Sequence, residues 1–147
     1  MDYEYVSYIG VPVNRVWQAL ITKADVDQYY LAPLGKLDLQ EDGEIYYGTE
    51  KNKVISGEII DFIENEELSH SFRFAFRKDE EESVVLYQLE AIGDEVTELA
   101  VVHSGIVSEE TLQDIKGGWP TIISQLKTYL ETGSGLSWPE MQDDNQN

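Results

Sequence analysis

The stretch Ser108–Gly133, SEETLQDIKGGWPTIISQLKTYLETG, predicts a long helix around which the rest of the chain is organised. Ser108 is a typical N-cap residue, and Gly133 follows the last apolar turn as a typical helix end. The segment 117–120, GGWP, predicts a weak or bent point and a break in the helix at Trp119, because proline lacks an N–H donor and its ring crowds the preceding turn. Apolar residues at steps of three and four give this helix one face that needs a broad apolar surface: Leu112, Ile115, Trp119, Ile122, Ile123, Leu126, Tyr129 and Leu130.

The chain before this helix has the pattern of a sheet with two short helices. Residues 3–9 alternate as an edge strand, a helical face follows Asn14 as its N-cap, and a second short helix ends at Ala32-Pro33. From Gly35 on, the apolar period changes to two, and short polar turns separate six strands. Consecutive strands of this kind form an antiparallel meander with one face to cover, so the predicted fold class is α+β. The expected strands cover residues 35–40, 45–48, 53–63, 68–77, 85–90 and 99–103.

Aromatic residues are frequent on the predicted inner face of this sheet. Phe72, Phe74 and Phe76 alternate along one strand, and Gly57 predicts a bulge or tight bend in the preceding one. Walls of this kind suit planar hydrophobic ligands, and they suit an ordinary filled core equally well. The same two readings, packing or ligand entrance, apply to the pair Tyr29-Tyr30.

The two histidines, His70 and His103, both fall on the predicted inner face. Each has a functional reading as a polar anchor or general base and a structural reading as a partner of a carbonyl or hydroxyl group. The structural reading is favoured for both. They are far apart in sequence and have no HxH or HxxxH spacing, so we expect no metal, no cofactor and no catalytic residue.

The composition excludes several classes of partner. The chain has 29 acidic and 10 basic residues, a formal charge of −19, which repels phosphate backbones and anionic lipids. We therefore expect neither a nucleic acid nor a membrane partner, although the charge suits either a solvated surface or a basic partner. The absence of cysteine, of a basic N-terminal leader and of a long apolar run leads us to expect a cytoplasmic protein.

The last residues differ in pattern from the rest of the chain. Residues 134–147, SGLSWPEMQDDNQN, are polar, acidic and without periodicity, so we expect a flexible tail in which Trp138 is undocked. Residues 1–133 are expected to form a single domain, since no internal repeat or linker divides them.

Four segments occur in this order: VPVNRVWQAL at 11–20, GEIIDFIENEEL at 57–68, HSGI at 103–106 and GGWPTIISQLKTYLETG at 117–133. Together they resemble the AHSA-like family, homologues of the activator of heat-shock-protein-90 ATPase, within the START-like or Bet-v-like (SRPBCC) superfamily. The resemblance implies a helix-grip fold. In that fold a seven-stranded antiparallel sheet curves around the long C-terminal helix, two short helices follow the first strand, and an apolar cavity lies between sheet and helix.

The resemblance also implies functions. Relatives in the superfamily bind lipids, sterols or aromatic polyketides, so we expect a monomer that binds a small hydrophobic ligand without catalysis. One alternative is a chaperone-associated cofactor or stress-response protein that acts through its surface; family members that stimulate a chaperone's ATPase carry an extra N-terminal domain, which we do not expect here. Another alternative is a cyclase or hydrolase with a histidine base. The expected ligand-binding residues are His70, Phe72, Phe74, Tyr87, Leu89, Val101, His103, Trp119, Ile122, Ile123 and Leu126.

Overall fold

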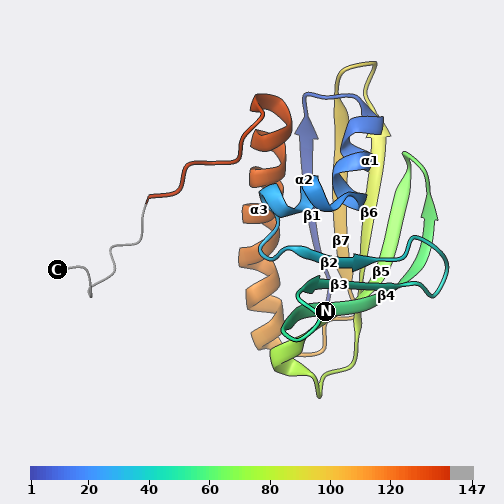
Figure 1. Ribbon diagram of the computed structural model, residues 1–147, viewed down its shortest axis with the longest axis vertical. Helices are drawn as coiled ribbons and strands as arrows, with labels where there is room; N and C mark the ends of the chain where they lie inside the picture. The colour runs from blue at the N-terminus through green and yellow to red at the C-terminus, as the bar shows by residue number, and fades with distance from the viewer. Residues whose placement is uncertain (140–147) are drawn as a thin grey trace.

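A seven-stranded antiparallel sheet and three helices make up the computed structural model, which describes residues 1–139 (Figure 1). The strand order is β1-β7-β6-β5-β4-β3-β2. The elements, in chain order, are β1 (Tyr3–Ile9), α1 (Val13–Ile21), α2 (Lys23–Tyr29), β2 (Leu34–Leu37), β3 (Glu44–Gly48), β4 (Lys53–Ile63), β5 (Glu67–Phe74), the 3₁₀ turn η1 (Ala75–Arg77), β6 (Ser83–Ala91), β7 (Thr97–Ser104) and α3 (Glu109–Thr132). This is the predicted α+β helix-grip order: one strand, two short helices, six strands and the long helix.

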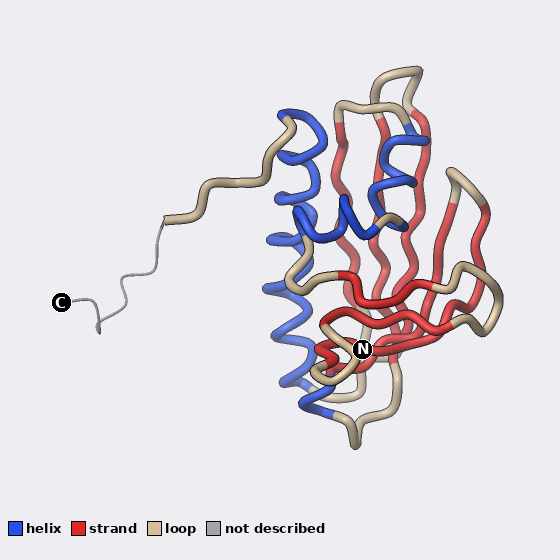
Figure 2. Tube along the Cα trace, viewed as in Figure 1, coloured by secondary structure: helices blue, strands red, loops and turns tan. Residues whose placement is uncertain are grey.

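The sheet is strongly curved, so that β2 and β3 run nearly across the direction of β1 and β7 (Figure 2). The curvature centres on β4, where a Cβ added to Gly57 would lie 1.9 Å from the carbonyl oxygen of Ser71 on β5. Only glycine permits this approach of the two backbones. A bulge between Ile59 and Asp61 shifts the β4–β5 register a few residues later. Gly57 is therefore needed for the close approach of β4 and β5, and the predicted bulge lies further along β4, between Ile59 and Asp61.

Helix α3 begins and ends as its sequence predicts. The Ser108 hydroxyl accepts a hydrogen bond from the Thr111 N–H at 3.2 Å, and Gly133 closes the helix in the left-handed conformation with φ of 93°. The expected break at GGWP is wrong, because α3 continues through Pro120. A Cβ at Gly117 or Gly118 would meet nothing within 4 Å, so this turn lies at the open surface. The carbonyl of Lys116 that lacks a donor at Pro120 can be hydrated there.

Two further expectations about local structure are wrong. Helix α1 has Pro12 rather than Asn14 as its N-cap, because the N–H groups of Arg15 and Val16 donate to the Pro12 carbonyl. Phe76 does not continue the inner face of β5, because η1 turns the chain after Phe74 and leaves Phe76 65% exposed. Both errors arise where a local hydrogen-bonded turn replaces the regular period.

Two polar clusters tie the helices to each other and to the sheet. Asp25 of α2 accepts two hydrogen bonds from Arg15 of α1, at 2.7 and 2.9 Å, and one from the Tyr129 hydroxyl of α3. The Arg15 guanidinium is the main cause that lowers the pKa of Asp25 to about 2. At the other end of α3, Arg77 of η1 forms an ion pair with Asp114 at 2.7 Å. These clusters fix both ends of α3 over the sheet.

At the end of the described chain, Trp138 is 56% exposed and the Leu136 N–H donates to the Gln125 side chain at 2.6 Å. The rest of the predicted tail, residues 140–147, lies outside the described residues. Within residues 1–139, none of the helices is long and apolar enough to cross a membrane.

Candidate functional site

A small pocket opens between α3, the end of β5 and the segment after α2. Its volume is about 30 Å³, room for roughly one water molecule. Its walls are almost entirely apolar or aromatic, and the residues that line it are Tyr30, Leu31, Phe72, Phe74, Asp114, Ile115, Gly118, Trp119 and Ile122. The space between helix and sheet is thus largely filled by side chains, and this pocket marks the point where it reaches the surface.

Behind the pocket, aromatic rings continue into the core. The Trp119 ring lies 5.8 Å from that of Tyr87, edge to face, and the Tyr87 ring lies 6.1 Å from that of His70. His70 also shares the inner face of β5 with Phe72 and Phe74, so it lies about 7 Å deeper along the strand than Phe72. Two rows of rings therefore lead from the pocket to His70.

His103 lies within a linear series of hydrogen bonds in which both of its ring nitrogens have a partner. The indole N–H of Trp119 can only donate, so His103 Nδ1, 3.1 Å away, accepts. The proton of the neutral ring is then on Nε2, which donates to the Ser83 hydroxyl at 2.7 Å. Ser83 in turn donates to the Phe72 carbonyl at 3.2 Å. Burial lowers the pKa of His103 to about 3, so the ring is neutral at physiological pH and each of these groups has its partner.

His70 has one polar atom without a partner. Its Nδ1 lies 2.7 Å from the Ser71 carbonyl oxygen, which can only accept, so Nδ1 carries the proton. Its Nε2 is therefore a hydrogen-bond acceptor, and it is buried with no partner. Burial lowers the pKa of His70 to about 4, which keeps the ring neutral. A group with so low a pKa is a weak general base at neutral pH.

A second buried polar atom without a partner is the hydroxyl of Tyr30, a partly buried residue in a group of tyrosines. The Tyr30 ring stacks on that of Tyr47 at 4.1 Å and meets that of Trp119 edge-on at 6.4 Å, yet the Tyr30 hydroxyl has no partner. The neighbouring Tyr29 hydroxyl, in contrast, donates to the Ala19 carbonyl at 2.9 Å. Burial raises the pKa of Tyr29, Tyr30, Tyr47 and Tyr87, so all four phenols stay neutral.

The interior therefore offers uncharged donors and acceptors within aromatic walls. No group of three or more His, Asp or Glu residues that could hold a metal ion occurs within residues 1–139. The one charged residue in the pocket wall, Asp114, already pairs with Arg77. This arrangement can take up an apolar molecule and make a hydrogen bond to its polar end, but it offers little for acid–base chemistry.

All the residues expected to bind ligand are buried, but only four of them reach the pocket wall: Phe72, Phe74, Trp119 and Ile122. His70 and Tyr87 lie behind them, His103 holds Trp119, and the remaining four belong to the core, namely Leu89, Val101, Ile123 and Leu126. Leu31, Asp114, Ile115 and Gly118 were not expected in the site. Ser83 could have been found, because the period of two places it on the inner face with Val85.

Comparisons with known proteins agree with this architecture. Residues 10–131 match the family model described as "Activator of Hsp90 ATPase homolog 1-like protein". No curated protein matches the chain significantly. A solved protein from Mesorhizobium loti is similar at 19% identity, with 89% of this chain and 97% of that chain covered and a TM-score of 0.77.

Two other solved structures share the fold at low identity. An HSP90 activator from Plasmodium falciparum is 17% identical, with 89% of this chain and 96% of that chain covered and a TM-score of 0.76. The Aha1 dimer from Colwellia psychrerythraea is 16% identical, with 92% and 99% covered and a TM-score of 0.75. On the family match, which spans most of its length, this chain belongs to the Activator of Hsp90 ATPase homolog 1-like family.

Proposed function

We propose that this protein binds a small, uncharged, hydrophobic molecule, aromatic or lipid-like, between α3 and the sheet. Three buried side-chain polar atoms have no partner within residues 1–139, and Asn65 Oδ1 belongs to the turn between β4 and β5. The observation that carries the proposal is the other two, His70 Nε2 and the Tyr30 hydroxyl. A buried polar group without a partner costs about 1–3 kcal/mol, so a folded protein rarely retains one without a reason. A ligand with a hydroxyl group would supply the donor that Nε2 lacks.

Entry requires side chains to move, because the pocket holds only about 30 Å³. Leu31 is the most exposed apolar side chain of the lining, at 51%, whereas Phe76 of η1, 65% exposed, stacks on the lining residue Phe74. Trp119, by contrast, is fixed by His103. We infer that a ligand displaces Leu31 and reaches inward past Tyr30 while Trp119 keeps its place.

The electrostatics favour an uncharged ligand. Both histidines are neutral and no buried Lys or Arg faces the pocket among the described residues, so a carboxylate would lose its hydration without gaining a counter-ion. An alcohol or phenol loses less, and its hydroxyl can donate to His70 Nε2. We expect micromolar affinity, about −8 kcal/mol.

Two-dimensional NMR titration of the full chain with 2-naphthol, naphthalene and 2-naphthoate tests the proposal. The expected order of affinity is naphthol first, then naphthalene, with naphthoate weakest. Amide signals of residues 68–76, 85–89 and 115–126 should shift together. If none of the three compounds shifts these segments, or if shifts map only to the outer face of the sheet, the proposal fails.

Tyr30→Phe and Tyr29→Phe form a matched pair of variants for the same titration. Tyr30→Phe removes the unpartnered hydroxyl and should weaken naphthol binding up to about tenfold. Tyr29→Phe removes a hydroxyl that already has its partner and should leave the affinity within about twofold. Equal effects of the two changes would mean that the Tyr30 hydroxyl has no part in binding.

The second candidate is an Hsp90-associated role, which family membership and the likeness to the Plasmodium falciparum HSP90 activator favour. It predicts that immobilised protein retains Hsp90 from a lysate at physiological salt. The expected oligomeric state differs from that of one relative, because the Colwellia psychrerythraea protein is a dimer whereas we expect this chain to be a monomer. Light scattering across a concentration series distinguishes the two states.

A further inference from the structure

The outer face of the sheet, which carries no helix, combines a groove with a continuous apolar strip. The groove has a volume of about 390 Å³, and its lining includes Ile63, Glu67, Glu90, Glu98 and Ala100. Along the same face, Val6 of β1 pairs with Ala100 of β7, and Val102 of β7 pairs with Leu86 of β6. Val6 is 44% exposed and Ile63 45%. Exposed apolar surface rimmed by polar groups is typical of a protein contact site.

The groove contains an unfavourable arrangement of charge. Glu90 and Glu98 are directly opposite each other on β6 and β7, and like charges in that position destabilise a sheet. Tyr8 of β1 is the neighbour of Glu98, and the pKa of its hydroxyl is raised. The main cause is its hydrogen bond with Glu98, and the negative charges of Glu98 and Glu90 raise the pKa further. Within residues 1–139 neither glutamate has a Lys or Arg partner.

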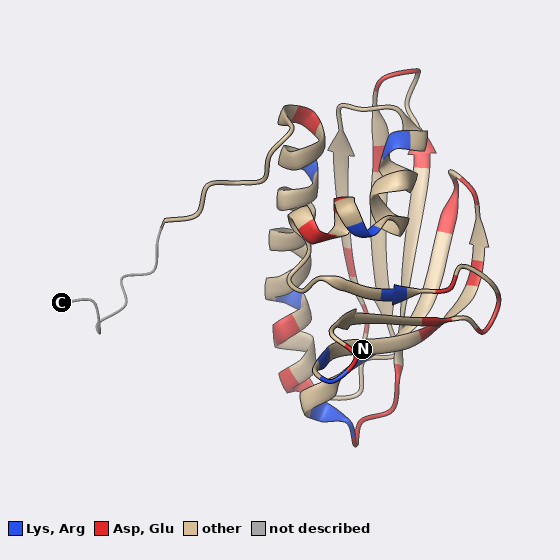
Figure 3. Ribbon diagram, viewed as in Figure 1, with Lys and Arg blue, Asp and Glu red and all other residues tan. Residues whose placement is uncertain are grey.

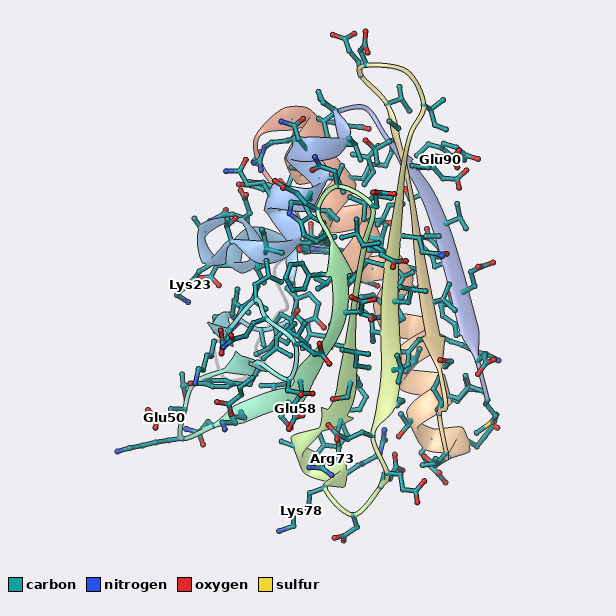
Figure 4. The ribbon with its side chains drawn as sticks, turned by 90° about the vertical axis from the view of Figure 1, so that its right-hand side faces the viewer. Lys23, Glu50, Glu58, Arg73, Lys78 and Glu90 are labelled. Atoms are coloured by element: carbon teal, nitrogen blue, oxygen red, sulfur yellow. The ribbon has the colours of Figure 1, made fainter. Side chains whose placement is uncertain are left out.

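Basic side chains lie elsewhere on the molecule. The strands β1, β6 and β7 contain no Lys or Arg, and Figure 3 shows such residues on the helices and on other strands. In Figure 4, Glu90 lies toward one end of the strands, whereas Arg73 and Lys78 lie toward the opposite end. The repulsion between the two glutamates is therefore not relieved within the described chain.

We propose that this outer face docks a basic, amphipathic protein segment. The cationic groups of that segment would lie at Glu90 and Glu98, and its apolar side chains would cover Val6, Leu86 and Val102. A second copy of this chain does not fit, because its own acidic surface would be repelled. A metal ion does not fit either, since no group of three or more suitable ligands occurs in the described residues. A small polyamine would leave the apolar strip uncovered.

The test uses the full chain and three short synthetic peptides: an amphipathic peptide of lysine and leucine, one of lysine and serine with equal charge, and one of glutamate and leucine. Only the first should bind, with amide shifts on the outer face of β1, β6 and β7 and none along α3. Binding should weaken as salt rises. Equal binding of the lysine–serine peptide, or shifts confined to other surfaces, would overturn the proposal.

The variant Glu90→Gln/Glu98→Gln should weaken binding of the lysine–leucine peptide by about tenfold. It should also melt at a higher temperature, because it removes the repulsion, so loss of binding cannot be attributed to unfolding. The control Glu41→Gln/Glu50→Gln changes net charge equally at two exposed sites away from the groove and should alter affinity less than about twofold. Equal weakening by both double variants would mean that only net charge matters and would overturn the proposal. Because the groove lies on the face opposite the pocket, failure here leaves the proposed interior ligand untouched.

Discussion

The two histidines lie in one row across the inner face of the sheet, on β5 and β7 with Val85 of β6 between them, yet they differ in how their polar atoms are used. Around His103 every polar group has a partner, from the Trp119 indole through the imidazole and Ser83 to the Phe72 carbonyl. Around His70 the Nε2 atom is left over, as is the hydroxyl of Tyr30 nearer the surface. One region has the features of structure alone, and the other has the features of a site with unused binding capacity.

The comparison shows how alike residues can take opposite roles. Both rings are buried and neutral, and burial lowers the pKa of both. Only the hydrogen-bond partners distinguish them. A buried acceptor without a donor reduces stability, and the protein can recover that loss only through a molecule that supplies the donor. The following measurements compare the two regions directly.

The largest expected difference is between His103→Leu and His70→Leu. The first change leaves the Trp119 N–H buried without an acceptor and should reduce the free energy of unfolding by about 2–4 kcal/mol. The second removes the Nδ1 hydrogen bond to the Ser71 carbonyl together with the unpartnered Nε2, and these opposed effects should change the free energy of unfolding by less than about 1 kcal/mol. Urea denaturation of both variants measures this. Equal losses would mean that Nε2 of His70 has a partner after all.

Acidification should reveal His70 through the pH dependence of stability. Its pKa is about 4 in the folded state and near the ordinary 6.5 in the unfolded state. The unfolded chain therefore binds the proton first, and stability falls as pH drops from about 6.5 to 4. The wild type should lose up to about 3 kcal/mol relative to His70→Leu between pH 7 and pH 4. Comparison with the variant cancels the contributions of the carboxylates. A constant difference would contradict the burial of a neutral His70.

Phenylalanine substitutions at Tyr29 and Tyr30 should change the stability by smaller amounts and in opposite directions. Tyr29→Phe loses a buried hydrogen bond to the Ala19 carbonyl and should destabilise the protein by about 1 kcal/mol. Tyr30→Phe removes a hydroxyl with no partner and should stabilise it by a similar amount. Thermal denaturation of the two variants at matched protein concentration measures both changes in stability. If Tyr30→Phe is destabilising, its hydroxyl is satisfied in solution.

Much of the fold could be predicted from local signals. The strands at 3–9 and 53–63 and the cap and stop of α3, Ser108 and Gly133, follow from period, capping and glycine chemistry. The predicted break in α3 at GGWP is wrong, because this turn of the helix faces open surface and the unpaired carbonyl of Lys116 can be hydrated.

The candidate site was less predictable. The apolar period of the sequence places His70, Phe72 and Trp119 on the inner faces of their elements. Leu31 and Asp114, in contrast, reach the pocket only through the packing of α2 and α3. Which histidine is satisfied depends on Ser83 and Trp119, which reach His103 from another strand and from the long helix. Period alone therefore finds the wall of the site but not its free polar atoms.

The imidazole nitrogen resonances of the two histidines test the central claim most directly. Long-range ¹H–¹⁵N spectra are recorded for the full chain with and without saturating 2-naphthol. Binding should move the His70 Nε2 resonance toward that of a hydrogen-bonded acceptor and leave both nitrogens of His103 unchanged. Saturation of the protein with no change at His70, or with equal changes at both rings, would contradict the account.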